Sequence, residues 1–262
     1  MKRGRKILWG AQRGVQLLLG GALLALWSAP AVSEGAPASM ARVPAGTYVP
    51  LYSGDQLEQV PVAVFLLDRY LVTNADFAAF IAAHPVWSPG KPPAIKADHN
   101  YLAQWPVAPP KARMPVTGVS WFAAREYCRY RGKRLPTVAE WERAAAAPDA
   151  ARPDEGEDAL LKRILEWYGR ANEEREVGSV YENIFGVFDL HGSVWEWTED
   201  FNSVTIDADG REQGDSDRFC GAGGLNASNP RDYAAFMRQA FRSSLRAAST
   251  AKNLGFRCAR NI

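Results

Sequence analysis

NIFGVFDLHGSVWEWTED, residues 183–200, combines large apolar side chains, carboxylates and two glycines, and no other stretch combines so much core with so much polarity. The apolar residues before Gly192 predict a short buried strand, and those after it predict a return to core packing: Val187, Phe188 and Leu190, then Val194, Trp195 and Trp197. Gly192 itself allows a turn with positive φ. This stretch is therefore expected to organise the fold.

Glu196 lies between Trp195 and Trp197, so its carboxylate is predicted to be buried. A bare carboxylate in an apolar interior is very costly and takes up a proton instead. We therefore expect Glu196 to be hydrogen-bonded, paired with a cationic side chain, or bound to a metal cation.

The motif G-V-F-D-L-H-G-S-V-W-E-W, residues 186–197, resembles the G-L-Y-D-M-x-G-N-V-W-E-W signature of the formylglycine-generating (sulfatase-modifying factor) superfamily. Three further segments resemble that family in the same order: RVPAGTY at 42–48 its opening strand and turn, VSWFAAREYCRYRGKRLPTVAEWE at 119–142 its central helix pair, and NLGFRCAR at 253–260 its closing strand. The resemblance implies a single α+β domain with a variant of the C-type-lectin fold.

Local patterns agree with an α+β domain that contains much irregular structure. The expected strands are 43–48 and 60–67, and the expected helices are 73–84, 120–132, 137–147, 158–168 and 229–241. Thr137 and Glu140 form a T-x-x-E capping box at the start of the third helix. The proline-rich segment 85–115 is expected to be a long surface loop pinned by aromatic side chains.

The composition and the amino-terminal residues indicate where the protein is located in the cell and which partners it binds. The chain has 262 residues, 47% hydrophobic and 23% charged, and its net charge of +2 gives no argument for nucleic acid as a partner. Basic residues precede an apolar run over 15–27, which is the layout of a secretory signal and shorter than the roughly 20 residues of a membrane anchor, the alternative. We expect a cleaved signal over 1–31, a flexible mature start over 32–40, one domain over 41–262, and no membrane span after cleavage.

The chain has three cysteines, so they cannot all pair within one molecule. The residues alone permit three pairings of Cys128, Cys220 and Cys258. The resemblance implies the bridge between Cys128 and Cys258, which match the family's central-helix and closing-strand cysteines. Cys220 is then the remaining thiol.

Structural calcium is a second property that the resemblance implies. The family's turn ligands match Ser193, Val194 and Glu196, although serine replaces the family's asparagine. The second calcium site of the family begins at a pair matched by Ala171-Asn172, with Glu173 following. The alternative for Glu196 is an ion pair with an arginine.

Catalysis in the family depends on two cysteines that follow a Gly-Gly-Ser strand and bind copper(I) through thiolates. Gly223-Gly224 matches the glycine pair, but Ser228 and Tyr233 stand where the two thiols belong. A hydroxyl or a phenol is a poor ligand for copper(I). We therefore predict that this chain does not generate formylglycine by the family's mechanism.

Cys220 is the remaining soft ligand, three residues before that glycine pair and next to Arg218. A lone cysteine is commonly a small buried hydrophobe, but a neighbouring cation lowers the pKa of a thiol and favours reactivity or metal binding. Cys220 is the candidate catalytic residue, and His191 could join it in a site for copper or iron. The sequence does not distinguish these two metals.

Family members that lack the copper pair include a periplasmic pyoverdine-maturation branch and accessory proteins of copper nitrite reductases, and this chain resembles both. The first hypothesis is an exported maturation or modifying factor that acts on another exported protein or peptide-like product. The second is a C-type-lectin-like binding module without catalysis. A reactive Cys220 favours the first, and a Cys220 packed in the core favours the second.

Overall fold

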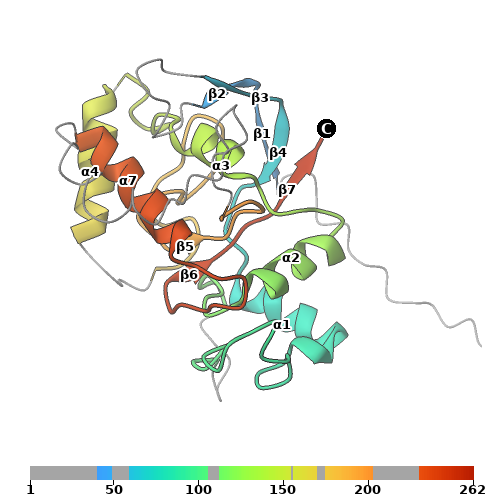
Figure 1. Cartoon of the computed structure of the whole chain (residues 1–262). Helices are drawn as coiled ribbons and strands as arrows, with labels where there is room; N and C mark the ends of the chain where they lie inside the picture. Colours follow the sequence, from blue (N-terminus) through green and yellow to red (C-terminus); the bar gives the residue numbers. More distant parts are fainter. Residues whose placement is uncertain (1–39, 49–58, 106–111, 155, 170–174, 203–229) are drawn as a thin grey trace, which may run out of the picture. The chain divides into compact units, whose positions relative to one another are not determined.

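Short strands form three small sheets in the part of the chain that the computed structural model describes, residues 40–48, 59–105, 112–154, 156–169, 175–202 and 230–262. These residues belong to one compact unit (Figure 1). The expected signal segment and mature start lie outside them. No helix in the described ranges is long and apolar enough to cross a bilayer.

A three-stranded antiparallel sheet in the order β1-β4-β7 joins both ends of the described chain. Strand β1 is Met40–Val43, β4 is Phe65–Asp68 and β7 is Ala259–Asn261. The register sets Val43 opposite Phe65 and Leu67 opposite Ala259. All four of these side chains are buried, so one face of the sheet covers the core.

The strands expected at 43–48 and 60–67 are each divided in two, which corrects their predicted bounds. After β1, the chain leaves the sheet and forms β2, Gly46–Tyr48, which pairs with β3, Val60–Val62, before the chain returns as β4. Residues 44–45 and 63–64 lie between the two ladders and belong to neither, and Pro44 provides no backbone N–H there. The result is a corner between two sheets.

The helices follow the predicted pattern. They are α1 Asn74–Ala83, the short 3₁₀ turn η2 Pro85–Trp87, α2 Trp121–Tyr130, α3 Val138–Ala145, α4 Glu157–Gly169 and α7 Pro230–Ser243. Thr73 and Thr137 accept hydrogen bonds from the backbone N–H groups of Asp76 and Glu140, and both capping boxes are complete. Ser120 caps α2 by accepting a hydrogen bond from the backbone N–H of Ala123. These caps confirm the expected N-termini of α1, α2 and α3, and the expected α+β fold class is also confirmed.

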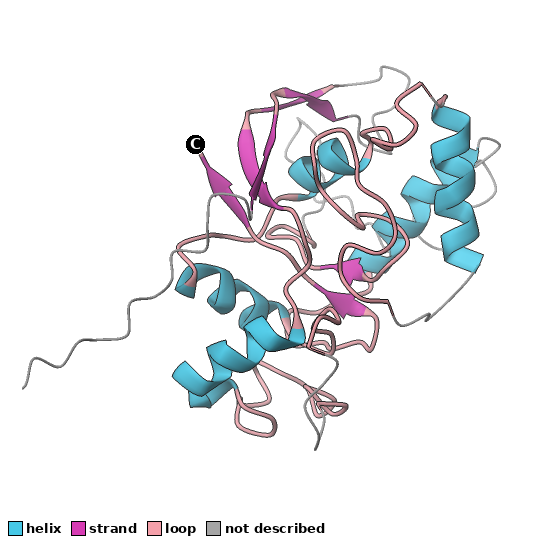
Figure 2. Cartoon of the chain, turned by 180° about the vertical axis from the view of Figure 1, so that it is seen from behind, coloured by secondary structure: helices cyan, strands magenta, loops and turns pink. Residues whose placement is uncertain are grey.

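Two apolar clusters form the core. One surrounds α1 and α2, where the rings of Phe77, Tyr127 and Phe256 contact one another beside Trp197. The other lies between the three-stranded sheet, α3 and the buried side chains of Val187 and Leu190. Long loops connect the helices and strands that surround these two clusters (Figure 2).

The organising stretch differs from its prediction at one point, because Val187 to Leu190 do not form a strand. Phe188 makes only an isolated bridge to Glu182, and Asp189 has a left-handed backbone with φ of 57°. The Asp189 carboxylate accepts hydrogen bonds from the backbone N–H groups of Gly178 and Val180, the second at 2.8 Å. Extended pairing is therefore replaced by a folded loop. Beyond Gly192, whose φ is 88°, the strand β5, Trp195–Glu196, pairs in parallel with β6, Leu254–Gly255.

Cys128 of α2 and Cys258 are joined by a disulfide across 130 residues, with Cα atoms 5.6 Å apart. This is the pairing that the resemblance implies. Asp68 supports the second cysteine, because its carboxylate accepts from the backbone N–H of Cys258 at 3.1 Å and pairs with Lys133.

We expect the double substitution Cys128→Ser and Cys258→Ser to lower the free energy of unfolding by about 2 to 5 kcal/mol, because the bridge restricts the unfolded chain. Denaturant unfolding of both proteins measures this difference. Cys220→Ser is the control and should leave the bridge in place. A non-reducing peptide map that shows Cys220 in a disulfide would contradict the pairing.

Candidate functional site

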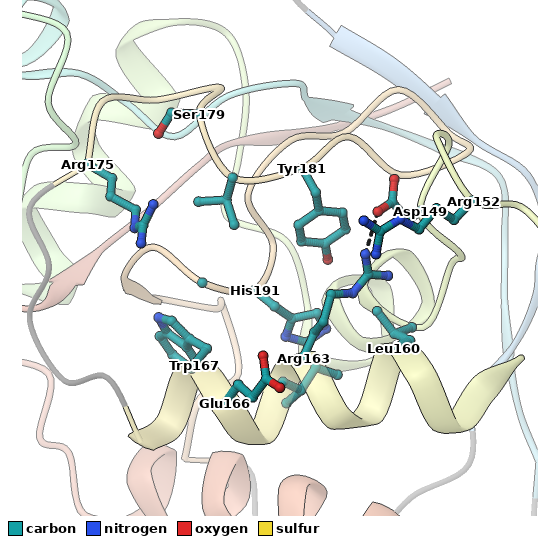
Figure 3. Close-up of a pocket in the computed structure, with 13 residues that line it drawn as sticks. Asp149, Arg152, Leu160, Arg163, Glu166, Trp167, Arg175, Ser179, Tyr181 and His191 are labelled. Atoms are coloured by element: carbon teal, nitrogen blue, oxygen red, sulfur yellow. Dashed lines mark hydrogen bonds and ion pairs between the residues drawn. The ribbon is translucent and has the colours of Figure 1, made fainter. Parts of the chain in front are cut away.

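One face of α4 forms the floor of a cavity of about 340 Å³ (Figure 3). Leu160, Arg163, Ile164 and Trp167 line it from positions i, i+3, i+4 and i+7, which share one side of a helix. A volume of this size lies at the lower end of the range for small-molecule pockets. The cavity is the candidate functional site within the described residues.

Three loop segments complete the walls of the cavity: Asp149 and Arg152 after α3, Arg175 with Ser179 to Tyr181, and the turn His191–Gly192. Gly192 is required at this turn because an added Cβ would lie 2.7 Å from Cγ1 of Val180, and because its φ is positive. The organising stretch thus contributes directly to the wall.

Asp149 and Arg163 form a partly buried ion pair at one end of the cavity. The Arg163 Nη1 donates to Oδ2 of Asp149 at 2.5 Å, while Oδ1 accepts from the backbone N–H of Ala151 at 2.9 Å. The guanidinium of Arg163 also lies 5.9 Å from the ring centre of Tyr181. Both oxygens of Asp149 are therefore engaged.

The Tyr181 hydroxyl is buried, and it makes no hydrogen bond of good geometry with any residue that the structure describes. Burial raises the pKa of Tyr181, and this effect outweighs the lowering by Arg257, Arg163 and the nearby His191 backbone. The phenol consequently stays protonated and remains a hydrogen-bond donor.

His191 is buried beside Tyr181, with the two rings nearly parallel and 6.4 Å apart. Burial, helped by Arg238, lowers the pKa of His191 to about 3. Its Nε2 lies 3.1 Å from the carbonyl oxygen of Ala145, which can only accept, so Nε2 carries the proton. His191 is therefore a neutral imidazole held in one tautomer.

Chemically, the cavity offers hydrogen-bond donors and ring faces rather than an acid–base pair that works near neutral pH. His191 has too low a pKa to serve as an efficient general base, and Tyr181 has too high a pKa. The described geometry supports binding more directly than proton transfer.

Glu196 does not line this cavity, and its side chain is fully buried with that of Arg257. Its two carboxylate oxygens accept from Nε and Nη2 of Arg257 at 2.8 and 2.9 Å, which is the bidentate form of an arginine–carboxylate pair. The expectation that Glu196 is paired, hydrogen-bonded or cation-bound is confirmed in its ion-pair form.

This geometry does not fit the implied calcium site at Glu196. Both oxygens are already occupied by one guanidinium, whose positive charge repels a divalent cation beside it. No cluster of three or more histidine, cysteine or acidic side chains suited to a metal occurs in the described ranges. Ser193 and Val194, the other two residues of the implied calcium site, lie directly before β5.

The other predicted site residues lie outside the described residues. They are Asn172 and Glu173 of the second calcium site, the candidate catalytic Cys220, and the Gly223-Gly224 segment. Calcium binding at Asn172 and Glu173, and the role of Cys220, stay predictions.

Sequence reasoning missed most of the cavity. The sequence predicts only an acidic loop over residues 148–157. For α4 it predicts only an amphipathic helix, whose apolar stripe is Leu161, Ile164, Leu165 and Tyr168. Arg163 gives no local signal for this pair, because Asp149 lies in the loop before α4 and not on the helix itself. Of the cavity residues, the sequence singled out His191 and Gly192 in the organising stretch, and Ile164 only as part of the apolar stripe.

Comparison with known proteins identifies the class. The family model described as "Sulfatase-modifying factor enzyme 1-like domain" matches residues 29–262. The fold, the motif of the organising stretch and the closing strand agree with that match. The chain belongs to the formylglycine-generating enzyme (sulfatase-modifying factor) family.

A formylglycine-generating enzyme from Thermomonospora curvata is 31% identical over 258 residues, which cover 76% of this chain and 83% of that protein. Among solved structures, CarF has a TM-score of 0.51 at 17% identity, over 85% of this chain and 98% of that chain. PvdO from Pseudomonas aeruginosa has a TM-score of 0.46 at 19% identity, over 85% of this chain and 94% of that chain. The CarF similarity concerns the fold alone.

We expect Glu196→Gln to lower the free energy of unfolding by about 3 to 5 kcal/mol, because it leaves the buried charge of Arg257 without its partner. The exposed Glu126→Gln on α2 is the matched control and should change it by no more than about 0.5 kcal/mol. Chemical denaturation at pH 7 measures both. Equal effects of the two substitutions would show that the pair does not hold the fold.

The depressed pKa of His191 predicts a loss of stability in acid. Between its ordinary pKa of about 6.5 and its folded value of about 3, the unfolded chain binds a proton that the folded chain does not. The contribution is therefore fully present above pH 6.5 and falls toward pH 3, by up to about 1.4 kcal/mol per pH unit.

His191→Gln should remove that slope, because its amide N–H can still reach the Ala145 carbonyl but does not titrate. Unfolding free energies measured between pH 7 and pH 4 provide the test, with the exposed His99→Gln as the control that keeps the slope. An unchanged slope in His191→Gln would contradict a buried neutral imidazole.

Proposed function

We propose that this chain is an exported modifying or maturation factor that acts on another exported protein or peptide-like product and does not generate formylglycine. Family membership supports a modifying factor in general terms. The proposed export rests on the basic and apolar layout of residues 1–31. An accessory factor of an exported copper enzyme is one form of this proposal.

The disulfide is the observation that carries the exclusion of formylglycine formation. The chain has three cysteines, and Cys128 and Cys258 are joined to each other. Cys220 is then the remaining thiol, and one thiol does not form the two-thiolate copper site of the family. The proposed reaction must therefore differ from that of the formylglycine-generating relatives.

A binding module without catalysis is the second candidate, and the cavity favours it. His191 is neutral, Tyr181 stays protonated, and Asp149 is engaged by Arg163 and a backbone N–H. These groups are arranged to hold a ligand rather than to exchange protons with it. A covalent change in the mass of an exported partner would favour the modifying factor over this candidate.

We expect no conversion of a cysteine peptide carrying the sulfatase recognition sequence when the purified chain is incubated with copper and oxygen. The mass of the peptide is the measurement, and the Thermomonospora curvata formylglycine-generating enzyme is the positive control. Turnover that disappears in Cys220→Ser would overturn the exclusion and make Cys220 a catalytic ligand.

The positive half of the proposal is tested in producing cells with and without this chain. Intact-mass comparison of exported proteins and peptides should show at least one species whose mass changes when the chain is absent. Adding the purified chain in vitro to that species, taken from cells that lack the chain, should restore the mass found in cells that contain it. A partner that only copurifies, with no change in mass, would favour the binding module.

A further inference from the structure

We propose that the cavity on α4 is a binding site for a small planar carboxylate, that is, a flat ring bearing one negatively charged group. The inference concerns binding alone and holds whether or not the modifying reaction takes place in this cavity. It rests on a buried donor, on the charge of the walls, and on the rings that line them.

The buried donor is the Tyr181 hydroxyl, which points toward the interior of the cavity near His191 and Arg163 (Figure 3). It has no hydrogen-bond partner of good geometry among the described residues. A buried hydroxyl without a partner costs about 1 to 3 kcal/mol, and an acceptor oxygen of a ligand would recover it. Because this phenol stays protonated, it selects an acceptor.

The charges of the wall indicate the sign of the ligand. Of the lining residues that the structure describes, three are arginines, Arg152, Arg163 and Arg175, and two are carboxylates, Asp149 and Glu166. Asp149 already accepts from Arg163 and from the backbone N–H of Ala151. Among the described lining residues arginines outnumber carboxylates, so the lining favours an anionic ligand over a cationic one. Arginine is well suited to this role because its planar fork complements a carboxylate.

The rings that line the cavity indicate a flat body for the ligand. Trp167, Tyr181 and His191 border the space, with Leu160, Ile164 and Val180 between them. Trp167 is held in place by an edge contact to Trp195 of β5, with ring centres 5.0 Å apart. Ring faces of this kind favour offset stacking with an aromatic ligand. A bare inorganic anion would leave these apolar walls uncovered.

The test uses 4-hydroxyphenylacetate and its uncharged amide, 4-hydroxyphenylacetamide, which differ mainly in the negative charge. Titration calorimetry and tryptophan fluorescence of the full chain measure binding. We expect saturable binding of the acid and at least about tenfold weaker binding of the amide, the size of effect that one charge-assisted hydrogen bond gives. Amide binding as tight as acid binding, or no acid binding below about 10 mM, would overturn the proposal.

Tyr181→Phe separates binding from folding. It removes only the hydroxyl, so acid binding should weaken about five- to tenfold, while the midpoint of unfolding should stay the same or rise, because the lost group had no partner. Binding equal to that of the native chain would refute the assigned donor. A fall in the unfolding midpoint would also refute it, because that result would mean that the hydroxyl is satisfied in the free protein.

Arg175→Gln tests the charge of the wall, with Arg129→Gln as the matched control. Arg129 is exposed on α2 and does not line the cavity. Loss of the acid's advantage over the amide in Arg175→Gln, with the control unchanged, supports the site. An equal effect of both substitutions would assign the preference to the general charge of the protein and overturn the proposal.

Discussion

The buried pair of Glu196 and Arg257 is the interaction on which the other parts of this structure depend. Glu196 ends β5, and Arg257 lies between β6 and β7, so the pair joins the organising stretch to the closing segment. Arg257 also donates through Nη1 to the carbonyl oxygens of Asp68 and Arg69 at 3.3 and 3.2 Å. One guanidinium therefore fixes three segments that are far apart in sequence.

A chain of contacts leads from this pair to the cavity. Arg69, which offers its carbonyl to Arg257, donates to the carbonyl of Gly186 and pairs with Glu182, and so holds the loop that precedes Asp189. A separate cluster supports the helices: Glu142 of α3 binds Arg238 and Arg242 of α7, and α7 lies beside α4 (Figure 1). These two arginines lower the pKa of Glu142 to about 2, against the opposing effect of burial. The cavity wall is thus held by charges that are compensated within the core.

The sequence predicts those features that local chemistry determines. Capping at Thr73 and Thr137, the turn at Gly192 and the burial of Glu196 each depend on residues a few positions apart, and each is found. The division of the first strands depends on which sheet receives each half, and the cavity depends on loops that meet only in the folded chain. A helical pattern indicates that one side of α4 is apolar, but not that Arg163 on it reaches Asp149. The identity of the cation at Glu196 was open for the same reason, because Arg257 lies 61 residues away.

The disulfide also determines how the chain responds to proteolysis. A bridge between Cys128 and Cys258 closes a covalent ring that contains α3, α4, the organising stretch and α7. A single backbone cut anywhere inside this ring leaves both fragments attached to each other. The nicked molecule keeps its mass, apart from one water, until a reductant separates the fragments. The parts of the cavity therefore stay tethered after one cleavage, which favours their reassembly over their diffusion apart.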